Sequence, residues 1–251
     1  METQLHVELL RHTLAPEELV AMAAKLCYSP STINNLHDKI HSKDQSAFVE
    51  KLMSMNHEPP LEHASFTFGI EGVSRALLAQ ITRHRLASFS VQSQRYVAQD
   101  QGSCFNYIIP PRIKALGEIH VAEYKRQMHL MHEWYVEWKN TLVEAYGAGE
   151  SANEDARFVL PNASETRMKV TMNVRELRHF FSLRMCNRAQ WEIRELAHQM
   201  WKACFAVAPA LFADAGPGCL RGACPEGVKS CGKALDVKNE RFRDMKEIGW
   251  D

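Results

Sequence analysis

The fold of this chain turns on residues 63–96, which read HASFTFGIEGVSRALLAQITRHRLASFSVQSQRY. Apolar side chains alternate with small or polar ones at the start, which predicts a half-buried strand with apolar positions at Ala64, Phe66, Phe68 and Ile70. A helix is expected over about Ser74–Arg83, with Gln80 and Arg83 three residues apart on one face. The rest of the stretch, rich in serine, glutamine and arginine, is predicted to be a loop.

The same region lacks acidic residues. Asp and Glu make up 30 of the 251 residues, so the 28 residues from Gly72 to Gln99 would be expected to hold about three or four, yet they hold none. They do carry basic side chains, at Arg75, Arg83, His84, Arg85 and Arg95. Arg binds phosphate or carboxylate through a rigid fork, and Ser and Gln add neutral hydrogen bonds. The stretch therefore favours a site for a phosphate-bearing ligand over plain solvated surface.

Helices are predicted on both sides of this stretch, over Pro16–Tyr28, Asp44–Met55, Glu118–Tyr146 and Gln190–Val207. Residues 167–172 alternate as a second strand, and Asn173 with Glu176 forms the capping-box pattern of a helix that ends near Arg184. A strand thus leads twice into an Arg-bearing helix. Glu118–Tyr146 is one long helix or two joined ones. Its apolar residues cover more than one stripe, so part of it is expected to pack against another subunit.

Composition describes an ordinary globular protein. The chain is 45% hydrophobic and 24% charged, with 30 basic and 30 acidic residues and no net charge. Zero net charge argues against general binding to nucleic acid or membrane surfaces. No apolar stretch approaches the ~20 residues of a membrane span. The N-terminus lacks a signal-peptide pattern, so a cytoplasmic location with reduced thiols is expected.

Metal and nucleophile patterns are weak. No domain boundary is visible before a Cys- and Gly-rich tail, so residues 1–215 are predicted to form one domain and 216–251 the tail. The tail thiols Cys219, Cys224 and Cys231 match no common zinc spacing, so free thiols in a flexible tail are favoured over a metal site. His57, Glu62 and His63 form no ligand set either, and no metal is expected. The serines of the basic run are interpreted as phosphate-binding hydroxyls rather than nucleophiles.

Several motifs resemble the flavin-dependent thymidylate synthases. The hallmark is Arg-His-Arg, seven residues, then Ser, here at Arg83–Arg85 and Ser93, followed by Arg95 and Tyr96. Further blocks occur in family order: PLEH at 60–63, ARFVLP at 156–161, NVRELRHFFSLR at 173–184 and AQWEIRELA at 189–197. Together they cover most of residues 27–197.

The resemblance implies a fold and a reaction. It implies an α+β fold with an antiparallel sheet and long flanking helices, in a single domain that assembles as a homotetramer with active sites shared between subunits. It implies bound FAD as the cofactor. It also implies that dUMP is methylated to dTMP, with 5,10-methylenetetrahydrofolate as the carbon donor and NADPH as the reductant.

The resemblance also implies roles for individual residues. The positions that would line FAD are His57, Arg83, His84, Arg85, Asn173, Arg175 and His179. Those that would hold dUMP are Gln80, Arg83, Val91, Gln92, Ser93, Gln94, Arg95, Arg157 and Arg184. The loop from Val91 to Arg95 would add backbone amides. Arg184 is the candidate catalytic residue, as a cation that stabilises negative charge on the uracil ring.

Three positions depart from the family pattern. Val91 stands where relatives commonly carry Glu or Gln, so that only its backbone could serve there. Pro59 replaces a Ser or Thr, and His179 replaces an Asn found in some members. Two other functions stay open: a nucleotide- or FAD-binding regulatory protein without turnover, and an RNA-binding module, which the zero net charge disfavours. The sequence leaves open what the tail cysteines do and in which order NADPH and folate bind.

Overall fold

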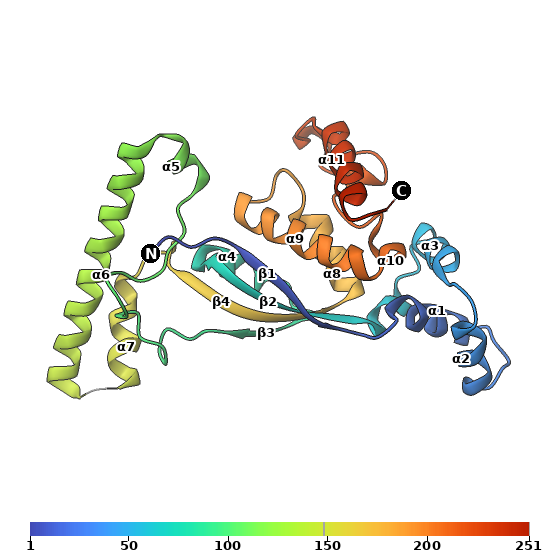
Figure 1. Cartoon of the computed structure of the whole chain (residues 1–251), viewed down its shortest axis with the longest axis horizontal. Helices are drawn as coiled ribbons and strands as arrows, with labels where there is room; N and C mark the ends of the chain where they lie inside the picture. Colours follow the sequence, from blue (N-terminus) through green and yellow to red (C-terminus); the bar gives the residue numbers. More distant parts are fainter. Residues whose placement is uncertain (148, 251) are drawn as a thin grey trace. The chain divides into compact units, whose positions relative to one another are not determined.

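The computed structural model describes residues 1–147 and 149–250. Within them the chain has an α+β fold whose four strands form one sheet in the order β1-β2-β4-β3 (Figure 1). The strands are β1 (His6–His12), β2 (Ser65–Ser74), β3 (Ala87–Val91) and β4 (Glu165–Asn173). Thr13 pairs with Ser65, and Gly72 lies against Gln4, so β1 and β2 run antiparallel. Thr67 meets Thr171 while Gly72 binds Glu165, so β2 and β4 do too.

The helices account for most of the remaining residues. They are α1 (Pro16–Leu26), α2 (Ile33–His41), α3 (Ser46–Ser54), α4 (Arg75–Ile81), α5 (Pro111–Ala115), α6 (Glu118–Tyr146), α7 (Glu150–Ala156), α8 (Val174–Arg184), α9 (Trp191–Val207), α10 (Pro209–Phe212) and α11 (Ala234–Glu247). Short 3₁₀ helices are η1 (Pro59–His63), η2 (Arg157–Val159), η3 (Gly218–Leu220) and η4 (Gly227–Lys229). No helix of the described chain is both long enough and apolar enough to cross a membrane.

Contacts group the residues into two compact units. Unit 1 contains Met1–His6, Ile70–Arg83 and Phe89–Lys169, and unit 2 contains Val7–Gly69, His84–Ser88 and the chain from Val170 onward. In unit 1, α6 and α7 run alongside each other (Figure 1), and a core forms around Phe105, Tyr107, Ile109 and Met128. In unit 2, aromatic rings of β2, α8 and α10 pack together, with Phe212 meeting Phe66 at 5.5 Å and Phe181 at 6.0 Å between ring centroids.

The strand predicted from residues 63–71 is confirmed and is longer than expected. Phe66, Phe68 and Ile70 are buried, and β2 continues to Ser74. Gly72 has φ +68°, and a Cβ there would overlap the Gln4 carbonyl oxygen, so this position requires glycine. The Ser74 hydroxyl accepts from Leu77 N–H and caps α4.

Two boundaries after β2 were predicted wrongly. Helix α4 ends at Ile81, so Arg83 lies beyond it, although Arg83 N–H still donates to Gln80 C=O at 3.3 Å. The residues after it were expected to form a loop, but Ala87–Val91 is strand β3. Half-buried Ala87, Phe89 and Val91 alternate there with exposed Ser88 and Ser90. This is a period of two that the serines obscured.

The other predicted elements agree with the structure to within a few residues. Glu118–Tyr146 is one continuous helix, and the Asn173 side chain caps α8 by accepting from Glu176 N–H. Helix α2 was not predicted; Thr32 caps it by accepting from Asn35 N–H. The tail folds as well: its helix α11 places the Arg241 guanidinium 3.6 Å from the centre of the Trp201 ring.

Candidate functional site

Helix α8 carries the densest group of candidate residues in unit 2. Its first turn presents Arg175, which is exposed and bonded to Glu58 at 3.2 Å and Glu62 at 2.5 Å. Both glutamates come from the segment around η1, and their hydrogen bonds and charges raise the pKa of Arg175. Pro59 occupies the first turn of η1, where its missing N–H and fixed φ are tolerated. The departure at Pro59 is therefore compatible with the local fold.

A cavity of about 450 Å³ opens beside α8. Its lining includes the guanidinium groups of Arg175, Arg178 and Arg221, the His179 imidazole and the Ser182 hydroxyl. Glu58 and Glu176 are the acidic residues of its lining. Three guanidinium groups outnumber the two carboxylates of this lining, so the cavity favours an anion such as a phosphate.

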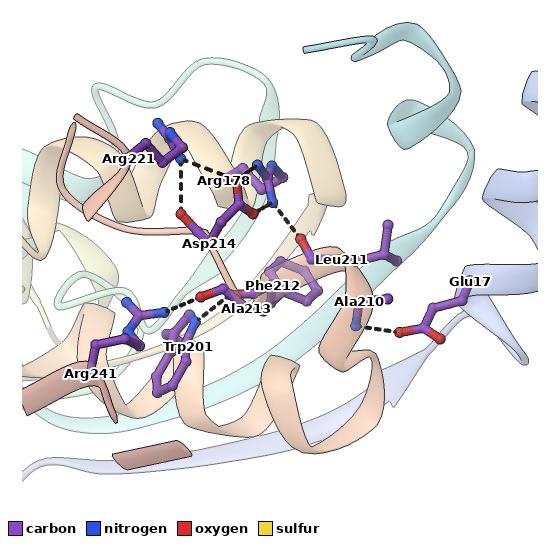
Figure 2. A network of polar contacts seen from close by, with 10 residues as sticks. All are labelled: Glu17, Arg178, Trp201, Ala210, Leu211, Phe212, Ala213, Asp214, Arg221 and Arg241. Carbon is purple, nitrogen blue, oxygen red and sulfur yellow. Dashed lines mark hydrogen bonds and ion pairs between the residues drawn. The ribbon is translucent and has the colours of Figure 1, made fainter. Parts of the chain in front are cut away.

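Arg178 is held by the protein itself. Figure 2 shows Arg178 and Arg221 converging on Asp214, with Arg178 bonded to both carboxylate oxygens at 2.7 and 3.0 Å. Burial would raise the pKa of Asp214, but the hydrogen bonds and charge of Arg178 prevail and lower it. Arg178 thus fastens α8 to the chain after α10.

His84 lies between two side chains of α8 and is hydrogen-bonded to both. Its Nδ1 is 2.9 Å from Glu176 Oε1, and its Nε2 is 3.1 Å from Arg184 Nε. The His84 and Glu176 side chains are only 3% and 6% exposed, and the Phe180 ring packs edge-on to the imidazole at 5.0 Å. Burial and the Arg184 and His179 charges lower the pKa of His84, while the Glu176 contact raises it; the net shift is downward.

The other unit 2 candidates lie in different surroundings. Arg85 is exposed, in contrast to its buried neighbour His84. His57 lines a separate cavity of about 840 Å³ between α1, α2 and α3, together with Tyr28, Phe48 and three lysines. The structure therefore brings Arg175 and His179 to one cavity and places His57 at another.

The candidates for dUMP, apart from Arg184, lie in unit 1. Arg95 contacts the carboxylates of Glu150 and Glu154 on α7, and its carbonyl accepts from the Asn153 amide at 2.9 Å. These contacts come from a helix more than fifty residues away, so no local pattern predicted them. They fix the guanidinium on the side of α7.

The backbone of the predicted nucleotide loop is partly used by the protein. Gln92 N–H donates to Arg167 C=O at 2.9 Å, and Arg95 N–H donates to the Ser93 hydroxyl at 3.2 Å. Val91 is the last residue of β3. A role for backbone amides in anion binding therefore rests on Ser93 and Gln94. The Gln94 side-chain nitrogen is buried without a hydrogen-bond partner.

Arg75 is a candidate that the motifs did not single out. It begins α4 and is half-buried, and its Nε is buried without a hydrogen-bond partner, although Nη2 reaches Gln92 C=O at 3.4 Å. Burial lowers the pKa of Arg75, and the nearby charge of Arg157 lowers it further. An anion would satisfy both the two neighbouring cations and the buried, unpaired Nε of Arg75. The acid-free composition was the available sequence signal for this residue.

Metal-binding geometry is not found among residues 1–147 and 149–250: no three His, Cys, Asp or Glu side chains there are placed to hold an ion. The cysteines of the described chain are unpaired thiols. Cys186, Cys219 and Cys224 line a cavity of about 510 Å³ next to Arg184, and the thiol groups of the tail lie near one another.

Sequence relatives match nearly the whole chain. A sequence model of the family described as "Thymidylate synthase complementing protein" matches residues 8–210. A Geobacter sulfurreducens protein named flavin-dependent thymidylate synthase is 51% identical, over 95% of this chain and 98% of its own length. A Clostridium tetani protein of the same name is 47% identical, over 92% and 95%.

Two solved structures resemble the fold. The UMP/dUMP methylase PolB from Streptomyces cacaoi, bound with 5-Br dUMP, has a TM-score of 0.66 at 25% identity, over 84% of this chain and 93% of its own. Thymidylate Synthase X (ThyX) from Helicobacter pylori with FAD and dUMP has a TM-score of 0.61 at 22% identity, over 84% and 99%. With the family match over residues 8–210 and the near-full-length relatives, these findings show that the chain belongs to the flavin-dependent thymidylate synthase family.

Proposed function

We propose that this chain catalyses the reductive methylation of dUMP to dTMP, with FAD as its cofactor. The main support for this function is that the chain is 47–51% identical, over nearly its full length, to proteins named flavin-dependent thymidylate synthase. Methylenetetrahydrofolate as the carbon donor and NADPH as the reductant are part of the proposal, as are a homotetramer with shared active sites and a cytoplasmic location.

Unit 2 contains cationic and neutral hydrogen-bond donors that suit the phosphates of FAD. The cavity beside α8 offers Arg175 and His179, with Arg178 and Arg221 in the same lining, which suits a diphosphate. Arg83, Arg85, Asn173 and His57 are the further residues proposed to hold the cofactor. His84 is left out of this set because it is buried and both its ring nitrogens have protein partners. When bound, the flavin supplies hydride chemistry that no side chain provides.

The nucleotide is proposed to be held by the basic residues of unit 1. Arg83, Arg95 and Arg157 would supply positive charge. Arg75 is added to this set because its buried Nε has no hydrogen-bond partner. The side chains of Gln80, Gln92, Ser93 and Gln94 and the backbone amides of Ser93 and Gln94 would supply neutral contacts. Gln94 supports this assignment because its amide nitrogen is buried with its donors unsatisfied.

Arg184 is proposed to polarise the uracil ring. A fixed guanidinium beside the N3–O2 edge would stabilise negative charge there and make the ring more reactive without a covalent nucleophile. Its Nε is held by His84, which reduces the reorganisation needed when that charge develops.

The test begins with the absorbance spectrum of the purified protein, followed by a dTMP assay with and without dUMP. An FAD spectrum and dUMP-dependent dTMP formation are expected. Failure to bind FAD after reconstitution would sink the enzyme assignment, and FAD binding without dTMP would favour the regulatory alternative.

The Arg184→Ala variant tests the catalytic assignment. It should keep FAD and lower kcat by about 10²–10³-fold, the usual cost of one preorganised donor aimed at developing charge. Arg243→Ala, on the exposed face of α11, is the matched control and should retain full activity. Unchanged turnover in Arg184→Ala would refute the role.

A further inference from the structure

Three side chains from two distant parts of the chain form a line in unit 2. Glu176 and Arg184 lie two turns apart on α8, and His84 comes from the segment between α4 and β3 and lies between them. The separations are 2.9 Å on the Glu176 side and 3.1 Å on the Arg184 side. All hydrogen-bonding atoms of the imidazole are thereby engaged.

The contact with Arg184 fixes the imidazole proton. A guanidinium is always protonated and donates only, so Nε2 of His84 must accept and carries no proton. The proton of the neutral ring therefore resides on Nδ1, where it donates to the Glu176 carboxylate. A buried carboxylate thus selects the tautomer, and the tautomer presents an acceptor to Arg184.

We propose that His84 and Glu176 are positioning residues that orient the Arg184 guanidinium for the pyrimidine. The central residue of the Arg83-His84-Arg85 motif would then act by holding Arg184 in place. This inference rests on the proposed function of Arg184. A hydrogen bond to Nε restricts rotation of the guanidinium plane, and a misplacement of about 1 Å at a reacting group can cost on the order of 10²-fold in rate.

Burial separates this role from direct cofactor binding. His84 is 5% exposed, whereas its neighbours Arg83 and Arg85 are both exposed. Phe180 covers one side of the ring at 5.0 Å. The motif therefore divides into two outward-facing cations and one inward-facing imidazole.

The arrangement makes Arg184 sensitive to protonation of His84. A second proton must bind Nε2, which removes the acceptor and places a cation beside the guanidinium. The ionisable groups that face His84 are Glu176, Arg184 and His179, all on α8. Because the pKa of His84 is lowered, the ring stays neutral at pH values below the ordinary histidine pKa of 6.5. We therefore expect kcat to fall only in more acidic solution.

Three replacements in the FAD-reconstituted protein test the proposal. His84→Leu removes the acceptor and should lower kcat on the order of 10- to 100-fold with FAD affinity and the KM for dUMP little changed. His84→Gln restores an oxygen acceptor near Nε2 and should recover part of the loss, with the acid fall in kcat abolished because an amide does not titrate. Glu176→Gln should show an intermediate loss. His37→Gln, whose side chain is 64% exposed on α2, is the control.

A measurement without turnover keeps the test separate from the proposed function. In protein labelled with ¹⁵N-histidine, the His84 resonances should report a neutral ring protonated at Nδ1, and Glu176→Gln should shift them. A ring protonated at Nε2, unchanged kcat in His84→Leu, or a loss confined to FAD affinity and reversed by saturating FAD would each overturn the inference. If His84→Leu fails to fold, His84→Gln and the resonances decide. An inactive wild type with the expected tautomer would contradict the proposed function and leave the His84 geometry intact.

Discussion

At the scale of a single side chain, Arg75 has an unfavourable environment that an anion would improve. It is half-buried near Arg157, and its Nε lacks a hydrogen-bond partner. Burying a cation beside a like charge costs free energy in the unliganded protein. Residues that are costly to the fold in this way occur often at binding sites.

Replacement of Arg75 by Gln should therefore separate stability from binding. The thermal midpoint of the unliganded protein should stay the same or rise, because a buried, repelled charge is removed. The Kd for dUMP should increase about 10- to 100-fold, since a hydrogen bond to a charged group is worth about 1.5–3 kcal/mol. Calorimetry measures both quantities, with exposed Arg112→Gln on α5 as the control. A lower midpoint with unchanged Kd would make Arg75 a structural residue.

Glu176 shows what sequence spacing can and cannot predict about a residue. Its distance from Asn173 correctly predicted the start of α8, where the Asn173 side chain accepts from Glu176 N–H. The Glu176 carboxylate, however, binds His84, which is 92 residues away in the chain. Local spacing reports backbone capping, but a contact between distant segments depends on the fold. The same holds for Arg95 and its partners Glu150 and Glu154.

At the scale of an element, α8 was predicted accurately because its start signal is local. The Asn173 cap and the helix that follows it agree with the prediction, and Val174, Leu177 and Phe181 are among the residues that this helix buries. Strand β3 was missed because serines at alternate positions resemble a loop. Helix α2 was missed because its short sequence, INNLHDKIH, has only two buried positions, Leu36 and Ile40. Short amphipathic elements acquire most of their stability from packing, which the sequence does not display.

Asn173 tests whether the cap of α8 also serves the cofactor. Asn173→Ala should lower the free energy of unfolding by about 1 kcal/mol, the usual cost of an N-cap. Asn173→Ser keeps an oxygen for Glu176 N–H and should stay within about 0.5 kcal/mol of the wild type. Urea unfolding measures both. If Asn173 also contacts FAD, both variants should weaken FAD binding; a loss in Ala alone would mean that the residue acts only through the helix.

At the scale of the whole molecule, the candidate residues follow the division into units. The positions assigned to dUMP lie in unit 1 apart from Arg184, and those assigned to FAD lie in unit 2 apart from Arg83. The motifs gave a candidate set of site residues and their order along the chain. They could not predict that one tripeptide, Arg83-His84-Arg85, contributes to both units. That division follows from long-range packing.

The stability of the chain as a whole should decline in mild acid because burial lowers the pKa of three histidines, His84, His132 and His198. The charges of Glu240 and Asp244 act to raise the pKa of His198, but burial prevails. The unfolded chain thus binds more protons once the pH falls below the ordinary value of 6.5, and stability decreases from there toward the folded pKa. Asp214 is charged at neutral pH, and its pKa is lowered in the folded protein. The stability that it contributes is therefore lost only in stronger acid, below about pH 4. His41, paired with Glu18 at the surface, opposes the decline weakly because water screens the pair.

Urea unfolding at about pH 7.5, 6 and 5 should show the loss of stability. In His198→Gln the loss should be smaller than in the wild type. Equal slopes in wild type and His198→Gln would mean that His198 is not held neutral by the fold.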